Sequence, residues 1–294
     1  MAVGLAKGTI APTYWPAPKF SDSYSFNEKL CFLREHPAQH NTWVVGSSMC
    51  LNNFSGQTYA SRLGDTSLMN IASWGLSIKD SYLWFTHLAQ LHQPRHVIML
   101  TNYVDFCQVN KQIEFDASMA YVHPKHAWSG VWQSIKHFNL KYYIKNFSYA
   151  KRVRTVPSSY EYLGFDRFGC VNLNPAGFQV DSVRWRDDHL NRTTAAEQYA
   201  YLDSMSAFCA NHQISFTCLQ SPYREGLCSN FSLEKKAKLE AHTALIQSIL
   251  NGRSQTFIDA NAQLLADTLF IDGTHLHAHG AASLTNYLID QGLR

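Results

Sequence analysis

The stretch TWVVGSSMCLNN, residues 42–53, decides the fold and carries the first candidate for chemistry. Its apolar run, Trp43–Val45, predicts a short buried strand that stops abruptly at Gly46-Ser47-Ser48. In an open parallel α/β sheet, ligands bind in the crevice at the carboxyl ends of the strands. A serine directly after such a strand lies where a nucleophile is useful. Gly-Ser-Ser is also common in turns, and serine is a good helix cap.

The alternation of strands and helices continues beyond this stretch. Leu68–Ala72 predicts a second strand, and apolar residues spaced by three and four predict an amphipathic helix over 78–91. His96–Leu100 is the clearest buried strand in the chain. Three strands that alternate with helices indicate βαβ units and a parallel sheet.

Three polar or small residues follow these strands, and each stands just past a carboxyl end: Ser48, Gly75 and Asn102. Because crossovers between parallel strands are right-handed, the three strand ends meet at one edge of the sheet. We therefore expect Ser48, Gly75 and Asn102 to lie close together.

An aromatic and basic segment at about residues 106–190 interrupts the alternation. We interpret it as an insertion, within a single domain of residues 1–294, that covers or flanks the site. A second structural layer without a ligand role is the alternative. The remaining elements that we expect are an extended lead-in over 1–25, helices at 26–35, 194–211 and 232–250, one or two helices within 128–144, and strands at 214–219 and 257–259.

Composition restricts the class of protein. With 46% hydrophobic and 16% charged residues among 294, the chain is globular, and a net charge of +3 is too small to predict nucleic-acid binding. Seven scattered cysteines without Cys-x-x-Cys resemble neither a disulfide framework nor a zinc site, which favours a reducing compartment. Without a signal-like or membrane-spanning apolar run, we expect a cytoplasmic protein. Membrane association, or the periplasm if a signal or anchor was removed, is the alternative.

The C-terminal part supplies a base for Ser48. An unactivated serine is a weak nucleophile and needs a base that a third group orients. Asp272 and His275 are three residues apart, so on a turn they point to the same side and the carboxylate can hold the imidazole. The backbone N–H groups of Ser48 and Gly75 and the side-chain amide of Asn102 are then candidate donors for an oxyanion.

These residues, in this order, resemble the SGNH (GDSL-type) hydrolase superfamily. That family carries a serine after its first strand, a glycine after the second, an asparagine after the third and a C-terminal Asp-x-x-His. The resemblance covers almost the whole chain apart from the insertion. It implies a three-layer α/β/α sandwich with a central parallel, flavodoxin-like sheet and a catalytic triad. The matching residues are Ser48, Gly75, Asn102, Asp272 and His275.

The chain departs from the family pattern at three positions. Ser47 replaces an aspartate, Leu100 replaces a glycine, and Tyr103 follows Asn102 where the family has an aspartate. These changes leave the nucleophile and base in place and bear on the oxyanion donors. The stretch also lacks the second glycine of a G-x-S-x-G elbow, which argues against an α/β-hydrolase fold.

The Gly-Ser-Ser variant looks most like members of the family that move acyl groups on bacterial polysaccharides. The resemblance implies O-acetyl transfer to a carbohydrate such as a capsule, exopolysaccharide or O-antigen. It needs no bound cofactor, and acetyl-CoA is the acyl donor that a cytoplasmic chain would use. Two alternatives stay open. A carbohydrate O-acetylesterase would pass the acyl group to water, and a polysaccharide-binding or assembly protein would have kept the fold without the activity.

Other polar residues near the site have competing interpretations. Alternate histidines at 275, 277 and 279 would share a face if the segment were a strand, but no further ligand cluster accompanies them, so we expect no metal. We expect His277 and His279 to line the rim or cap a helix. Tyr223 and Arg224 follow another strand at the same edge and are weaker candidates for substrate contact, with a structural turn as the alternative. Asp105 is a similar case.

Overall fold

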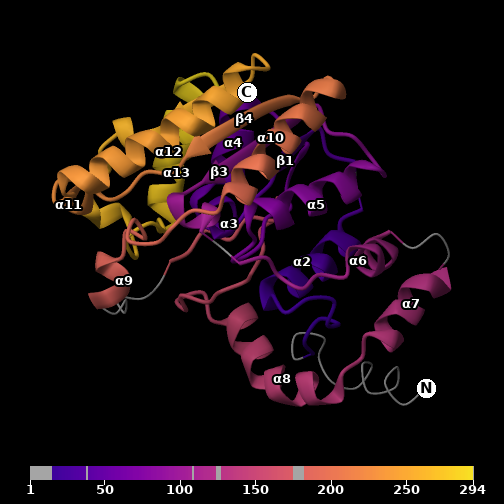
Figure 1. The fold of residues 1–294 in the computed structure, drawn as a ribbon. Coiled ribbons are helices and arrows are strands. Elements are labelled where there is room, and N and C mark those ends of the chain that lie inside the picture. The colour runs from indigo at the N-terminus through magenta and orange to yellow at the C-terminus, as the bar shows by residue number, and fades with distance from the viewer. Residues whose placement is uncertain (1–14, 38, 108, 124–126, 175–181, 294) are drawn as a thin grey trace.

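The protein is a five-stranded parallel sheet with helices on both faces (Figure 1). The computed structural model describes residues 15–37, 39–107, 109–123, 127–174 and 182–293. The strands are β1 (Thr42–Val44), β2 (Leu68–Asn70), β3 (His96–Thr101), β4 (Ser215–Gln220) and β5 (Thr256–Asp259). All four strand pairings are parallel, in the order β2-β1-β3-β4-β5.

The helices surround this sheet. They are α2 (Tyr24–Glu35), α3 (Ser48–Asn53), α4 (Gly56–Leu63), α5 (Ile78–Ala89), α6 (Phe115–Val122), α7 (Ala127–Lys136), α8 (Leu140–Thr155), α9 (Ser182–Arg186), α10 (Ala196–Asn211), α11 (Glu225–Cys228), α12 (Leu233–Asn251) and α13 (Ala278–Asp290). Single-turn helices are η2 (Tyr103–Phe106), η3 (Ala260–Ala262) and η4 (Asp267–Leu269).

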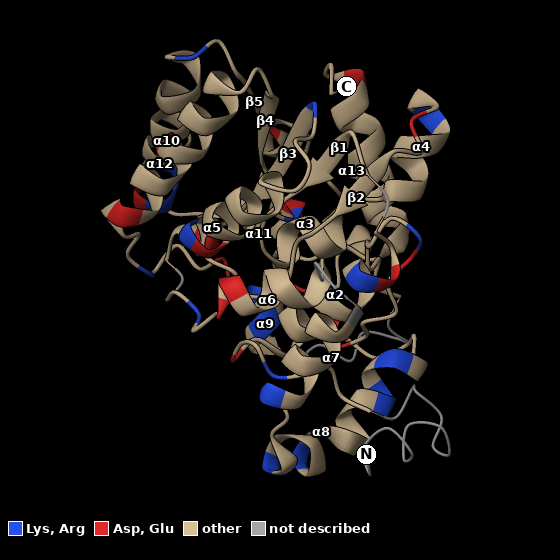
Figure 2. Cartoon of the chain, turned by 90° about the vertical axis from the view of Figure 1, so that its right-hand side faces the viewer, with Lys and Arg blue, Asp and Glu red and all other residues tan. Residues whose placement is uncertain are grey.

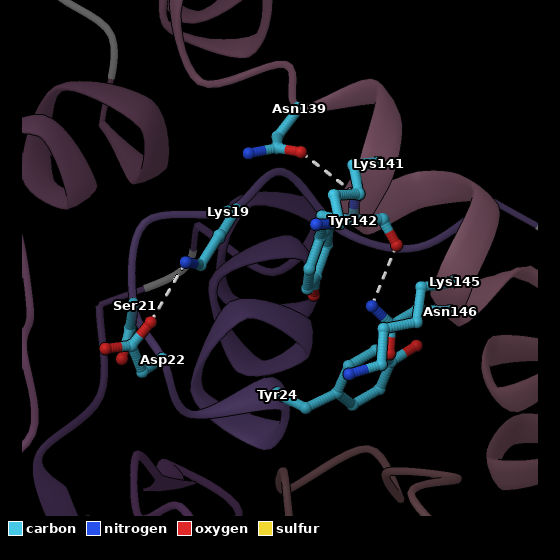
Figure 3. A pocket seen from close by; sticks show the side chains of 9 residues that line it. All are labelled: Lys19, Ser21, Asp22, Tyr24, Asn139, Lys141, Tyr142, Lys145 and Asn146. Carbon is cyan, nitrogen blue, oxygen red and sulfur yellow. Dashed lines mark hydrogen bonds and ion pairs between the residues drawn. The ribbon is translucent and has the colours of Figure 1, made fainter.

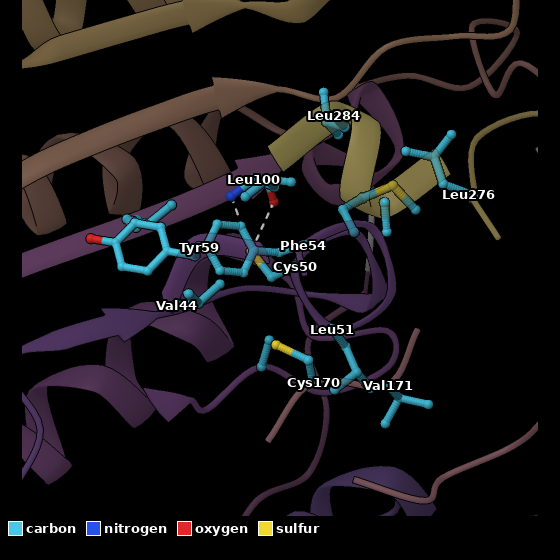
Figure 4. Close-up of a cluster of buried hydrophobic side chains, with 14 of the residues drawn as sticks. Val44, Cys50, Leu51, Phe54, Tyr59, Leu100, Cys170, Val171, Leu276 and Leu284 are labelled. Atoms are coloured by element: carbon cyan, nitrogen blue, oxygen red, sulfur yellow. Dashed lines mark hydrogen bonds between the residues drawn. The ribbon is translucent and has the colours of Figure 1, made fainter. Parts of the chain in front are cut away.

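The side chains of β3 alternate between two hydrophobic cores, one on each face of the sheet. Ile98 and Leu100 belong to the core that the sheet shares with α3, α4 and α13, part of which Figure 4 shows. Val97 and Met99 belong to the core shared with α2, α5, α10 and α12. Successive side chains of a strand point to opposite faces, so one apolar run serves both cores. The predicted three-layer α/β/α sandwich is therefore confirmed.

The strand order creates one crevice at the carboxyl edge of the sheet. The chain runs from β1 outward to β2, then crosses back to β3 on the other side of β1. In doubly wound sheets of this order, ligands bind where the strand order reverses, between β1 and β3. Ser48 follows β1, and Asn102 follows β3, so the topology brings both residues to that point.

The expected strands, and the helices at 26–35, 78–91, 194–211 and 232–250, lie within one or two residues of the observed ones. Local capping explains several boundaries. Ser77 and Asp80 form a capping box at the start of α5, and Ser232 caps α12 by accepting a hydrogen bond from the Lys235 N–H. Part of the expected lead-in, residues 1–14, lies outside the described residues.

Six helices were not predicted: α3, α4, α6, α9, α11 and α13. The segment after Ser47 was interpreted as a turn, but it forms α3 and α4, and α4 ends at Gly64 in the left-handed conformation (φ 70°). The C-terminal α13 was also missed. In the insertion, the segment 128–144 forms parts of two helices, α7 and α8.

The insertion contributes to the core as well as to the surface. Helix α6 packs on α2 and α5, and α7 packs on α6. Further along, Phe168, Cys170 and Val171 are buried in the core of α3, α4 and α13. The insertion is thus a structural layer joined to the sheet.

All seven cysteines are free, as the sequence predicts. Within the described ranges, no helix is both long enough and apolar enough to cross a membrane.

Candidate active site

Ser48 is held at the start of a short helix by its neighbours. The Ser47 side chain caps α3 by accepting a hydrogen bond from the Met49 N–H at 3.1 Å, so it fills a role that an aspartate also performs well. Before it, Gly46 has φ 148°, and a Cβ there would lie 2.7 Å from the Cys50 Sγ. The turn from β1 into α3 therefore requires glycine at position 46, because any Cβ would clash with the Cys50 side chain.

Ser48, His275 and Asp272 form a continuous chain of hydrogen bonds. The His275 Nε2 lies 2.9 Å from the Ser48 Oγ, and the His275 Nδ1 lies 2.8 Å from the Asp272 Oδ2. The other Asp272 oxygen accepts hydrogen bonds from the backbone N–H groups of Thr274 at 2.8 Å and of His275 at 2.7 Å. These backbone bonds fix the Asp-x-x-His turn, which places carboxylate and imidazole on the same side.

The charge on Asp272 determines the direction of these bonds. Burial alone would raise the pKa of its carboxyl group, but the His275 ring and hydrogen bonds from His275, Tyr160 and Thr274 hold that pKa well below its usual range. An ionised carboxylate only accepts hydrogen bonds, so the His275 Nδ1 carries the proton. The His275 Nε2 is then the acceptor for the Ser48 hydroxyl.

Tyr160, which the sequence analysis did not identify, is a further partner of Asp272. Its hydroxyl donates to the Asp272 Oδ2 at 2.5 Å, which is the oxygen that also faces the His275 Nδ1. Burial and the negative charge of Asp272 raise the pKa of Tyr160, so the hydroxyl keeps its proton. The Arg184 guanidinium lies 4.7 Å from the centre of the Tyr160 ring.

Three hydrogen-bond donors at the sheet edge have no acceptor among the described residues. The backbone N–H groups of Ser48 and Gly75 donate to none of them, and the Asn102 Nδ2 is buried without a partner. Gly75 has φ 66°, a left-handed conformation that favours glycine. Since these residues follow β1, β2 and β3, which are adjacent in the sheet, the donors belong to neighbouring strand ends with Ser48 in the middle.

Tyr223 fixes the orientation of the Asn102 amide. The Asn102 Oδ1 accepts hydrogen bonds from the Tyr223 hydroxyl at 3.0 Å and from the Val104 N–H at 3.4 Å. The Asn102 N–H donates to the Asp105 Oδ2 at 2.8 Å. Burial raises the pKa of Asp105 to about 7. With its oxygen engaged in this way, the amide leaves its nitrogen as the unused donor.

Tyr223 and Arg224 are not among the residues that line the cavity at Ser48, which corrects the suggestion that they contact substrate. Tyr223 is 1% exposed. Arg224 is buried too, pairs with Asp267 at 2.6 Å and donates to the Trp185 carbonyl. Both side chains follow β4 at the expected edge, but the turn folds them inward.

His277 caps a helix, and the strand that would align three histidines does not form. The His277 Nδ1 accepts hydrogen bonds from the His279 and Gly280 N–H groups at the start of α13, and its Nε2 contacts the Thr268 carbonyl. His279 lies in the first turn of α13. Among the described residues, no three His, Cys, Asp or Glu side chains are grouped as metal ligands.

A cavity of about 240 Å³ opens at Ser48 and His275. Most of its other walls come from the insertion, so the insertion flanks the site. Trp74, next to Gly75, adds an aromatic wall, and neither it nor Arg184 was identified from the sequence. The full lining is Ser48, Asn52, Trp74, Tyr149, Tyr160, Glu161, Leu173, Arg184 and His275.

A close backbone contact joins the insertion to the turn that carries Asp272. The Gly273 N–H donates to the Arg184 carbonyl at 3.0 Å, and a Cβ at Gly273 would overlap the Asp187 carbonyl oxygen. The segment that carries Arg184 is therefore held directly against the turn between Asp272 and His275.

No protein-family model matches this chain, and no curated protein matches its sequence. Solved structures with a similar arrangement are hydrolytic enzymes. They include the acetyl xylan esterase AlAXEase, with a TM-score of 0.48 and 10% identity over 86% of this chain and 99% of the other. The acetylxylan esterase Axe2 from Geobacillus stearothermophilus has a TM-score of 0.44 and 12% identity over 87% and 96%. LAE5, an alpha/beta hydrolase enzyme from the metagenome of Lake Arreo, has a TM-score of 0.45 and 11% identity over 86% and 94%.

Proposed function

We propose that this chain is a serine-dependent O-acyltransferase of the SGNH type that acts on a carbohydrate through an acyl-Ser48 intermediate. One observation carries the proposal. The hydrogen-bonded chain from Ser48 through His275 to Asp272 stands at the crevice of the sheet, beside three donors that have no acceptor among the described residues. A nucleophile, an oriented base and unused donors are the parts that acyl transfer requires.

In the first half of the reaction, the Ser48 Oγ attacks the carbonyl carbon of an acyl donor, and its proton passes to the His275 Nε2. Asp272 holds the ring and stabilises the imidazolium that forms. The Ser48 and Gly75 N–H groups and the Asn102 Nδ2 donate to the oxyanion of the tetrahedral intermediate. When the intermediate collapses, the bond to the leaving alcohol or thiol breaks, and that group takes the proton from His275.

In the second half, an acceptor hydroxyl attacks the acyl group on Ser48. His275 removes the proton of this hydroxyl and returns it to Ser48, so the acyl group leaves as a new ester. Trp74 and Tyr149 line the cavity, and flat aromatic rings suit the apolar faces of sugars. We therefore assign a carbohydrate hydroxyl as the acceptor and acetyl-CoA, a donor substrate and no resident cofactor, as the source of the acetyl group.

Hydrolysis is the second candidate, and a specific observation favours it. The His275 side chain is 15% exposed, so water can reach the base from the cavity. Water in place of the sugar hydroxyl makes the same site a carbohydrate O-acetylesterase.

The test compares the wild-type protein with Ser48→Ala and with Ser61→Ala, an exposed serine on α4 as a matched control. Each is incubated with p-nitrophenyl acetate, and with acetyl-CoA plus candidate glycans, while acetate and acetyl-glycan are measured. We expect Ser48→Ala to lower the rate by at least about 10³-fold, and Ser61→Ala to leave it unchanged. An acetyl group on the peptide that contains Ser48 would identify the intermediate by mass spectrometry.

The products separate the candidates. Acetyl-glycan formation supports the transferase, and acetate release that no glycan redirects supports the esterase. A Ser48→Ala protein as active as wild type in every assay would refute the catalytic proposal. A wild type that binds glycan without turnover would identify a binding protein.

A further inference from the structure

Helix α7 turns its apolar side away from the protein. Trp128 is 79% exposed and Trp132 is 63% exposed, and Val131 and Ile135 are exposed as well. These four residues, at spacings of three and four, occupy one face of the helix. A surface helix of a globular protein normally directs such a stripe to the core.

The opposite side of α7 is polar and faces the protein. Gly130 is buried, and a Cβ there would lie 2.9 Å from a guanidinium nitrogen of Arg34. Gln133 and Ser134 are half-buried, and the Gln133 Oε1 is fully shielded from solvent. The polarity of α7 is therefore inverted relative to its burial. Contiguous exposed apolar surface of this kind marks an interaction site.

Helix α8 extends this surface. Leu140, Ile144 and Phe147 are exposed at spacings of four and three, which again places them on one helical face. In Figures 1 and 2, α7 and α8 both lie on the side of the molecule away from the sheet. We call the exposed apolar residues of these two helices the α7–α8 face: Trp128, Val131, Trp132, Ile135, Leu140, Ile144 and Phe147.

Within α7, α8 and the loop between them, the charged side chains have one sign. From Ala127 to Thr155, the chain has six Lys or Arg residues and no Asp or Glu, and the basic residues of α8 are visible in Figure 2. Arg152 pairs with Glu161, and Arg154 pairs with Glu28. Of the remaining basic residues in this range, Lys136, Lys141 and Lys145 form no ion pair with a described residue.

Two of these lysines border a cavity beside the face. Lys141 and Lys145 line a cavity of about 350 Å³ together with the polar side chains of Asn139 and Asn146 (Figure 3). Lys19 lies across it and pairs with Asp22 at 2.9 Å. The cavity thus offers ammonium and amide donors next to the exposed apolar side chains, an arrangement suited to a phosphate that adjoins an apolar phase.

We propose that the α7–α8 face docks this protein on the surface of an anionic lipid bilayer. Tryptophan favours the boundary between headgroups and acyl chains, and lysines beside it are attracted to anionic headgroups. A helix with an apolar face rich in tryptophan and flanked by lysine lies in the plane of that boundary. A second copy of the chain fits less well, because a twofold contact would bring the two cationic faces together, and α7 and α8 carry no acidic side chain to pair with them. The inference does not depend on the proposed activity.

The test uses the full chain and sedimentation with vesicles of phosphatidylcholine alone or mixed with phosphatidylglycerol. We expect binding to the anionic vesicles that high salt weakens. Trp128→Ser with Trp132→Ser should lower the partition coefficient at least about tenfold, because two interfacial side chains are lost. Lys141→Gln with Lys145→Gln should lower it by a similar factor, since each lysine near a charged surface contributes about fivefold. Leu233→Ser, an equally exposed apolar residue on α12, is the control and should bind like wild type.

Further measurements identify what binds the α7–α8 face: lipid, a second copy of the chain or its own residues 1–14. Bromine-labelled lipids should quench the fluorescence of the wild type and should quench the Trp128→Phe, Trp132→Phe variant less. Wild type that binds no vesicle, or tryptophan and lysine variants that bind as well as wild type, would overturn the proposal. Self-association that depends on Trp128 and Trp132, without vesicle binding, would assign the face to a second copy. Binding that appears only when residues 1–14 are removed would assign the face to that segment. Thermal unfolding of each variant distinguishes lost docking from lost folding.

Discussion

Helices α5 and α7 are both amphipathic and both carry tryptophan, but they face in opposite directions. Trp84 of α5 is completely buried against the sheet, whereas Trp132 of α7 is 63% exposed. The apolar side of α5 is part of a hydrophobic core, so it stabilises the fold. The apolar side of α7 belongs to none of the hydrophobic cores of the described residues, so burying it against another surface would favour binding. The catalytic edge of the sheet and the α7–α8 face are therefore distinct functional surfaces. Single substitutions at one of them should change its own activity and leave the other unaffected.

Asp272→Asn should have the largest effect. The amide would donate its N–H to an unprotonated His275 Nδ1, so the ring proton would sit on Nε2. The His275 Nε2 could then not accept the proton of Ser48, and the rate should fall about 10⁴-fold. Initial rates with p-nitrophenyl acetate measure this loss. Vesicle binding should not change, and an Asp272→Asn protein that lost vesicle binding while remaining folded would contradict the separation of the two regions.

Trp84→Ala and Trp132→Ala test the comparison of the two helices directly. Truncation of the buried Trp84 leaves a cavity and should lower the free energy of unfolding by about 3–5 kcal/mol. Truncation of Trp132 should change it by less than about 0.5 kcal/mol, because the side chain is exposed. Urea denaturation of both variants measures the difference. Equal losses would show that α7 is supported by its tryptophan in the same way as α5.

Tyr160→Phe should have a smaller effect at the catalytic edge. The change removes one hydrogen bond to the Asp272 carboxylate but keeps the ring beneath Arg184, so kcat should fall about tenfold with KM little changed. The Tyr160 hydroxyl is one of the hydrogen-bond donors that hold the pKa of Asp272 below its usual range, so the change weakens the stabilisation of this carboxylate. A change in KM alone would make Tyr160 a substrate-binding residue only.

Lys29→Met contrasts a buried lysine with the exposed ones of α8. Lys29 donates to the Asn70 and Gly169 carbonyls, and burial lowers its pKa to about 7 from 10.5. Between these values the unfolded chain holds a proton that the folded chain releases, so stability rises with pH. The slope rises above pH 7 toward about 1.4 kcal/mol per pH unit, the value for one proton. Urea denaturation between about pH 7 and pH 9 should show this slope in wild type and a flatter one in Lys29→Met. Parallel curves would mean that Lys29 remains protonated throughout.

Much of the fold could be predicted from the sequence because its strands are short apolar runs between clear breaks. The positions of Ser48, Gly75 and Asn102 at strand ends follow from the alternation of strands and helices, and the Asp-x-x-His turn is local. Helix α3 was missed because six residues are too few for a periodic pattern, and its cap, Ser47, is equally typical of a turn.

The remaining features depend on contacts between distant residues. Tyr160 is one tyrosine in an aromatic-rich segment, and nothing local indicates that it meets Asp272, 112 residues away. Tyr223 follows a strand at the correct edge, but whether its side chain points to substrate or to Asn102 is decided by the turn. The apolar spacing of α7 predicts a helix without indicating which side faces the protein.

The contact between Gly273 and the backbone of Arg184 and Asp187 has a consequence for engineering. Together with the Tyr160 hydroxyl on Asp272, it ties the second half of the insertion to the turn that bears the base. This half cannot be exchanged as a module to alter specificity without disturbing the acid and base themselves. Among the described residues, the exposed face of α7 and α8 has no such hydrogen bond to the turn that bears the base. Substitutions confined to the exposed side chains of the α7–α8 face would therefore change where the protein resides and leave its chemistry intact, provided that Tyr149 of α8, which lines the cavity, is kept.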